Sequence, residues 1–187
     1  SSRNAPSGKS FRGWKGQGRM RLSATRSTRS AELWVAEASA LAKVCAAGAA
    51  VLTGLLQFPE PAADQRNLPC SCGHPAHYRG LRSKPVLTAV GKVEVSRPYY
   101  LCPHCQTGQF PADGELDIAD TEFSPGVRRM QGVVGQQVPF AQGRRQIELL
   151  AGLEVTAQGV ERTAEAIGAD IVRREQRESG RAVQLDL

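Results

Sequence analysis

The chain has 187 residues, and its 19 Gly, 11 Pro and 5% aromatic content argue against one large hydrophobic core. The formal net charge of +6 is segmental: residues 1–30 hold eight Lys or Arg and no acid, whereas the other 157 residues hold 16 basic and 18 acidic groups. This distribution excludes a uniformly basic protein and leaves local cationic segments as candidates for nucleic-acid contact.

The first segment, residues 1–30, is rich in Ser, Gly, Arg and Lys, with Phe11 and Trp14 as its aromatic anchors. We expect a disordered basic tail, because so little apolar surface cannot offset the entropy lost on ordering. Three roles fit this composition: loose phosphate contact, a solvated tail without a role, and an organellar transit peptide.

The second segment, residues 31–69, combines an Ala-rich helix with a linker. Residues 31–57 are dominated by Ala and Leu and contain no proline, which predicts a helix that ends before Pro59. The uncharged run over 44–59 has 16 residues, fewer than the roughly 20 that a bilayer span needs. We therefore expect a buried or helix-pairing segment without a membrane partner, in which Cys45 is a small buried hydrophobe.

The third segment, residues 70–110, contains two close cysteine pairs, Cys70-x-Cys72 and Cys102-x-x-Cys105. The residues between them alternate as two β-strands with a turn at Gly91-Lys92. A hairpin that brings two such knuckles together creates the tetrahedral donor set of a structural zinc site. Four thiolates leave no open position on the metal, so catalysis at this ion is not expected.

Other ligands and other chemistry stay open for these cysteines. Because Cys70-x-Cys72 is tighter than the usual knuckle, His74 or His77 is an alternative to Cys70 as a ligand, whereas His104 is expected to face solvent or to support the site. Disulfides are disfavoured at this spacing. A redox dithiol at Cys102 and Cys105 and unliganded thiols are the remaining alternatives.

The hairpin is also basic, with a formal charge of +4 over residues 70–105 before thiolates and metal are counted. We expect its cations to contact DNA phosphates. The predicted contacts are Arg79, Arg82, Lys84, Lys92 and Arg97.

The fourth segment, residues 111–123, carries five carboxylates and no basic residue. Their alternating spacing matches no EF-hand loop, so we expect a solvated acidic connector that shields the basic hairpin when nucleic acid is absent.

The fifth segment, residues 124–187, has the periodicity of three helices. Ser124-Pro125 predicts the start of the first helix, a second follows Pro139, and Thr156 caps the third. Two helices joined by a short Gly-containing turn, with a third helix packed on them, is the plan of a helix-turn-helix unit. DNA contact and protein packing both remain open for it; the predicted DNA contacts are Arg128, Arg129, Arg144, Arg145, Gln158 and Arg162.

The predicted fold class is therefore α+β: a small zinc-ribbon-like β unit followed by a trihelical helix-turn-helix bundle, preceded by the Ala-rich helix and the disordered tail. The predicted DNA contacts lie on both the β unit and the bundle. Among the motifs of catalysis we find no Gly-rich phosphate loop, no nucleophile elbow and no His-Glu-x-x-His.

With these motifs in order, residues 68–187 resemble the N-terminal part of bacterial insertion-sequence transposases of the ISKra group. The resemblance depends on several short stretches in a fixed order. They are Cys70-x-Cys72-Gly73, Tyr78-Arg79-Gly80, Arg82-Ser83-Lys84, Thr88-Ala89-Val90-Gly91, Arg97-Pro98-Tyr99-Tyr100-Leu101-Cys102, Cys105, Gly108, Ser124-Pro125 and the helix over 156–168.

The resemblance implies the DNA-binding portion of a DDE-type transposase that recognises the ends of its element in the bacterial cytoplasm, associated with the nucleoid. In that family Mg²⁺ held by three carboxylates promotes strand transfer, and the first catalytic Asp is expected beyond residue 187. We therefore expect a chain truncated before its catalytic domain, with structural zinc and no activity alone. The alternative is a zinc-stabilised interaction module that forms homo-oligomers and does not bind DNA.

Overall fold

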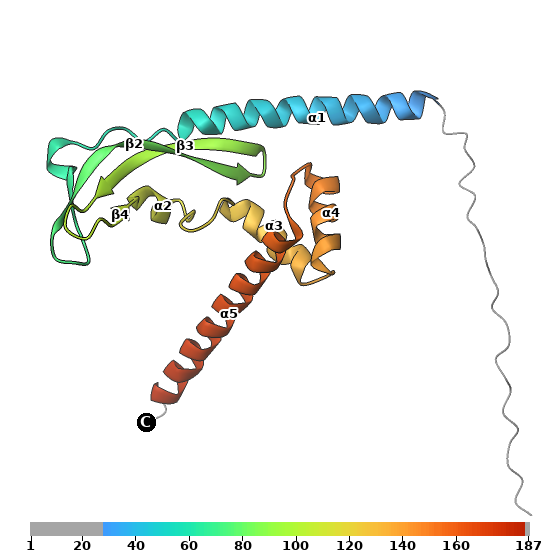
Figure 1. The fold of residues 1–187 in the computed structure, drawn as a ribbon. Helices are drawn as coiled ribbons and strands as arrows, with labels where there is room; N and C mark the ends of the chain where they lie inside the picture. The colour runs from blue at the N-terminus through green and yellow to red at the C-terminus, as the bar shows by residue number, and fades with distance from the viewer. Residues whose placement is uncertain (1–27, 186–187) are drawn as a thin grey trace, which may run out of the picture. The chain divides into compact units, whose positions relative to one another are not determined.

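The computed structural model describes residues 28–185 of the chain (Figure 1). By its contacts the chain divides into two units between Glu37 and Ala38, inside the first helix. The predicted disordered tail lies outside the described residues except for residues 28–30, which begin a helix. The described part is mixed α+β, with a four-stranded antiparallel sheet and five α-helices, so the predicted fold class is confirmed at this level.

The sheet follows chain order, β1-β2-β3-β4, because each strand turns back on the one before it. The short outer strands are β1 (Asn67–Pro69) and β4 (Gly108–Gln109), and the long central hairpin is β2 (Pro75–Thr88) with β3 (Gly91–Leu101). In this hairpin Val86 lies opposite Val93 and Arg82 opposite Arg97. The register therefore places an apolar pair near the turn and a cationic pair further along.

The hairpin turn differs from the sequence prediction by two residues. It lies at Ala89-Val90, and Gly91 already begins β3 with φ of +114°. Thr88 fixes the turn, since its hydroxyl donates to the Gly91 carbonyl at 2.8 Å and accepts from the Val90 amide at 3.3 Å. Gly91 provides the positive φ that this turn requires, rather than being a central turn residue.

The predicted Ala-rich helix is confirmed as α1 (Thr28–Leu55). Near its C-terminal end Ala49 and Leu52, with Leu56 just beyond, pack against Val86, Val93 and Val95 of the hairpin. The chain then pairs with the edge of β3, because the Phe58 amide donates to the Ser96 carbonyl at 2.9 Å. In length and composition alone, residues 29–55 of this helix meet the requirements of a membrane span.

Three further helices follow as predicted: α3 (Pro125–Gly135), α4 (Phe140–Ala151) and α5 (Ala157–Leu185). The Ser124 hydroxyl accepts from the Val127 amide, and the Thr156 hydroxyl accepts from the Gly159 amide at 2.9 Å. Both predicted helix caps are therefore confirmed. Gly152, with φ of +66°, ends α4 in the left-handed conformation that glycine tolerates.

The three helices enclose their own core of Val127, Ile147, Leu153, Val155 and Val160. Two of these side chains come from the connection between α4 and α5, so the connection itself is part of the core. The buried residues of α4 are Gly143 and Ile147, and Phe140 and Ala151 pack partly buried against the same core. Leu150, on the same helix, is 80% exposed.

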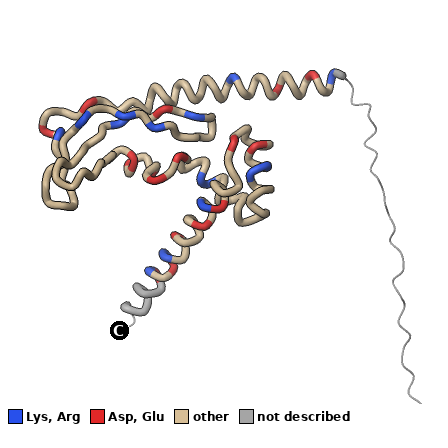
Figure 2. Tube along the Cα trace, in the orientation of Figure 1, with Lys and Arg blue, Asp and Glu red and all other residues tan. Residues whose placement is uncertain are grey.

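A fifth, short helix lies between the sheet and this core. It is α2 (Pro111–Glu115), and Pro111 occupies its first turn, where a missing amide costs nothing. Beyond it the chain makes a parallel bridge from Phe123 to Leu87 of β2. Asp and Glu follow one another along this stretch in Figure 2, yet it is folded against the hairpin rather than extended in solvent.

Candidate functional site

The four paired cysteines lie on two tight turns at one end of the sheet. The first turn follows β1, where the Gly73 amide donates to the Cys70 carbonyl at 2.9 Å and Gly73 has φ of +84°. The second follows β3, where the Gln106 amide donates to the Cys102 carbonyl at 3.0 Å. The antiparallel pairing of β2 and β3 brings these two turns together, although they are about 30 residues apart in sequence.

The four sulfur atoms converge on one point. Cys70 Sγ lies 3.4 Å from Cys105 Sγ, and Cys72 Sγ lies 3.5 Å from Cys102 Sγ. All four lie within 4.8 Å of one another. Zinc–sulfur bonds of about 2.3 Å would place sulfurs about 3.8 Å apart at the corners of a tetrahedron. The cluster therefore fits a structural metal site, and soft thiolate donors suit zinc among the common ions.

The close contacts cross between the two pairs rather than running within them. Cys102 approaches Cys72, and Cys105 approaches Cys70. A redox Cys-x-x-Cys motif would bring Cys102 and Cys105 together to form a bond of about 2.05 Å. Four ligands of one tetrahedral ion lie at similar distances from one another, and the four sulfurs here all lie within 4.8 Å of one another.

A second set of potential ligands, Cys72, His74 and His104, lies beside the first. The two imidazole rings are stacked, with centroids 3.9 Å apart and planes 8° from parallel. An imidazole binds a metal through a lone pair in the plane of its ring, and nearly parallel planes do not meet at one ion. His77 is engaged elsewhere, since its Nδ1 lies 2.6 Å from the side-chain oxygen of Asn67. The geometry therefore favours Cys70 over either histidine as the fourth ligand.

The thiols in the cluster differ in acidity. The pKa of Cys105 is lowered to about 6, first by hydrogen bonds from the Thr107 side chain and backbone and then by Cys70. At Cys72 the His74 backbone hydrogen bond lowers the pKa, but desolvation and the other three cysteines outweigh it and raise the value to about 12. The neighbouring thiols thus favour ionisation at Cys105 and oppose it at Cys72, and a bound divalent cation would favour the ionised form of both.

The cysteine cluster continues into a small hydrophobic core. Cys70 and Cys102 are buried with Ala76 and Tyr100, and the Tyr100 hydroxyl donates to the Gln65 carbonyl at 3.0 Å. A closed set of four sulfurs beside so small a core suits a structural role, because metal binding would supply folding free energy that the core lacks.

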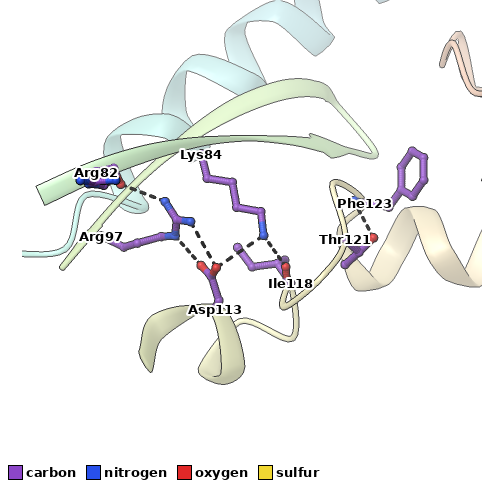
Figure 3. Close-up of polar contacts among 7 residues, drawn as sticks. All are labelled: Arg82, Lys84, Arg97, Asp113, Ile118, Thr121 and Phe123. Carbon is purple, nitrogen blue, oxygen red and sulfur yellow. Dashed lines mark hydrogen bonds and ion pairs between the residues drawn. The ribbon is translucent and has the colours of Figure 1, made fainter. Parts of the chain in front are cut away.

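The basic face of the hairpin is partly neutralised by one carboxylate, Asp113 of α2 (Figure 3). The Arg97 guanidinium forms a two-point ion pair with it, and the second contact, Nη2 to Oδ2, is 3.2 Å long. Lys84 Nζ lies 3.5 Å from the same carboxylate and donates to the Ile118 carbonyl at 2.6 Å. Asp113 is therefore a buried anchor, so the expected solvated connector is wrong at this residue.

Two of the five hairpin cations are consequently unsuited to phosphate contact. Arg97 is only 5% exposed, and Lys84 is half-buried by the connector. Arg79, Arg82 and Lys92 are exposed. The Arg82 guanidinium lies 3.9 Å from the centroid of the Tyr99 ring, a cation–π contact that leaves its edges free to donate.

The DNA contacts predicted on the helices also fall into two groups, side chains held in ion pairs and side chains that are free. Arg128 pairs with Asp117, and Arg144 pairs with Glu148 one turn later in α4 at 3.1 Å. The other four predicted residues are exposed, and their side chains form no ion pair or hydrogen bond with another described residue. They are Arg129, Arg145, Gln158 and Arg162.

Gln158 and Arg162 lie one turn apart near the start of α5 and line an open groove. The same groove is also lined by the connector carboxylates Asp117, Asp120 and Glu122. The sequence could not identify Asp113 as the carboxylate that pairs with Arg97 and Lys84, because nothing in the sequence distinguishes it from the other connector carboxylates.

Comparison with protein-family models gave no match, and comparison with curated proteins gave no significant match. The resemblance to ISKra-group transposases therefore stays a prediction. The functional assignment depends on this chain's own residues.

Proposed function

We propose that this chain is the DNA-binding portion of a transposase-like protein, which recognises the ends of its element in the cytoplasm. The observation that carries the proposal is the pair of exposed side chains, Gln158 and Arg162, on the first two turns of a helix that follows a tight helix–helix connection. The ordered motifs shared with ISKra-group transposases support it independently of this geometry.

The helical part supports a helix-turn-helix assignment. Residues 152–156 connect α4 to α5, and the connection is held by buried Leu153 and Val155. In helix-turn-helix proteins the N-terminal residues of the second helix contact base edges in the major groove. Arg at such a position recognises guanine and Gln recognises adenine, each through two hydrogen bonds.

The hairpin would fix the position of the protein on DNA, and it would not read the base sequence. Arg79, Arg82 and Lys92 are exposed cations on a rigid sheet, and Arg129 and Arg145 extend the cationic set onto α3 and α4. Contacts of this kind to phosphates fix orientation and account for most salt dependence. Zinc at the four cysteines would keep the hairpin folded and is proposed as a structural ion only.

Binding to DNA tests the proposal directly. A duplex selected by the protein from a random library should bind more tightly than a scrambled duplex of the same composition, and affinity for both should fall as salt rises. Arg162→Ala should cost about 1–3 kcal/mol on the selected duplex and much less on the scrambled one. Arg145→Ala should weaken binding to both duplexes alike. It should also reduce the slope of log affinity against log salt concentration by about one.

Arg177→Ala is the matched control, because Arg177 is an exposed arginine of the same helix, about four turns further on. It should leave the preference for the selected duplex unchanged. Fluorescence anisotropy on the full chain provides the measurement. Equal losses for Arg162→Ala and Arg177→Ala, or no binding to either duplex at low salt, would refute the assignment.

A further inference from the structure

Helix α1 exposes more large apolar side chains than any other described element. Their surfaces are 56–73% exposed. They are Leu33, Trp34, Val35, Leu41, Val44, Val51 and Leu55. Single exposed apolar residues are common on protein surfaces, but several of them along one helix indicate a surface that a binding partner covers.

The C-terminal half of α1 has two distinct apolar faces. One face, with Cys45, Ala49 and Leu52, is partly buried, and its last two residues pack against the hairpin. The other remains exposed and follows a spacing of four, three, four and three residues. This second face, here called the α1 stripe, consists of Ala40, Val44, Ala47, Val51 and Gly54.

Alternating spacings of three and four residues are the pattern of two helices that pack along their length. Within the α1 stripe, small residues recur every seventh position at Ala40, Ala47 and Gly54, and valines occupy the positions between them. A valine of one helix can therefore enter the space that a small residue leaves on an identical helix. The stripe is self-complementary, as a twofold interface requires.

A lipid bilayer fits the α1 stripe less well. The segment that satisfies the length of a membrane span ends at Leu55, yet its final turns contact the sheet. The Thr53 hydroxyl accepts from the backbone amide of Glu94 at 3.3 Å, which keeps a charged residue beside the helix. A bilayer around these turns would have to accommodate that strand and its carboxylate, at high cost.

We propose that the α1 stripe binds the same stripe of a second copy of this chain, with the two helices antiparallel. The charged residues of the helix, Arg29, Glu32, Glu37 and Lys43, all precede Val44. Glu37 continues the stripe seven residues before Val44, so parallel helices would place Glu37 against its own counterpart. Antiparallel helices set Val44 against Ala47 of the partner and Val51 against Ala40, so each valine faces a small residue. Glu37 then lies against the uncharged half, near Gly54 of the partner.

Sedimentation analysis of the full chain tests the proposal. The wild-type protein should sediment at twice the 20.1 kDa of one chain, in low and high salt alike. The double variant Val44→Glu, Val51→Glu should weaken association by more than ~100-fold, because each helix would bury unpaired carboxylates. Ala46→Glu, exposed on another side of the same helix, should leave the dimer intact.

Cysteine crosslinking with Cys45→Ala as the background tests the orientation. Antiparallel pairing predicts disulfides between Ala40→Cys chains and Val51→Cys chains, whereas Ala40→Cys alone should not crosslink to itself. Circular dichroism should show that every variant keeps its helices, since the substituted side chains are exposed apart from the half-buried Cys45, which becomes the good helix former alanine. A monomeric wild type, a dimer indifferent to the double variant, or self-crosslinking of Ala40→Cys would overturn the proposal.

Binding to lipid vesicles tests the alternative that a membrane surface covers the α1 stripe. The wild-type chain should not co-sediment with vesicles of phosphatidylcholine and phosphatidylglycerol. Co-sedimentation that the double variant abolishes would assign the α1 stripe to a membrane surface and overturn the proposed pairing. Neither outcome depends on the proposed binding to DNA.

Discussion

At the scale of single residues, the ionised groups of this protein have unequal roles. Arg97 was predicted to contact phosphate, yet it is buried and held by Asp113. It also lies over the Phe110 ring, 4.1 Å from the centroid. Sequence could indicate that Arg97 is one of several cations on a hairpin. It could not indicate burial, because that depends on where a carboxylate 16 residues later is placed.

Asp113→Ala should lower the free energy of unfolding by about 3–5 kcal/mol, because it leaves the buried Arg97 and the half-buried Lys84 without their carboxylate. Asp117→Ala is the control, since that side chain is 73% exposed and its pair with Arg128 should contribute at most about 1 kcal/mol. Urea denaturation of both variants provides the measurement. Equal effects for the two would contradict the anchoring role of Asp113.

At the scale of elements, the sequence was most informative where local chemistry sets the boundary. The caps at Ser124 and Thr156 and the prolines after α1 fixed their helices correctly. The hairpin turn was misplaced by two residues, because Gly91 was expected in the centre of the turn and instead supplies its positive φ at the end. The docking of the acidic connector through the bridge from Phe123 to Leu87 has no local sequence pattern.

Close packing of α3 on α5 gives a prediction at this scale. A Cβ added at Gly135 would lie 2.7 Å from the Cβ of Ala164, a rigid neighbour that cannot turn aside. Gly135→Ala should therefore destabilise the protein by about 1–3 kcal/mol, because the two helices must separate.

The matched control is Gly168→Ala in α5, where a Cβ meets nothing within 4 Å. It should stabilise the protein by roughly 0.5–1 kcal/mol, since alanine favours a helix over glycine. Thermal unfolding followed by circular dichroism compares the two variants. If Gly135→Ala proved as stable as Gly168→Ala, the close approach of the two helices would be wrong.

At the scale of the whole molecule, the order of segments and the mixed α+β fold were predictable, because each segment has its own composition and period. The four-cysteine cluster was predictable too, since the hairpin between the two pairs implies that they meet. Which surfaces stay free was not predictable. The formal charge of +6 suggests general attraction to DNA, yet the described cations are divided between buried pairs, surface pairs and a few free side chains.

We propose that the four sulfurs bind one divalent ion, which keeps the hairpin folded beside the helices. Elemental analysis of the purified chain, with the protein concentration determined independently, measures the moles of metal bound per mole of chain. We expect one zinc per chain, lost in Cys102→Ser and retained in Cys45→Ser, because Cys45 lies outside the cluster. A folded chain without stoichiometric metal, or equal metal in both variants, would contradict it.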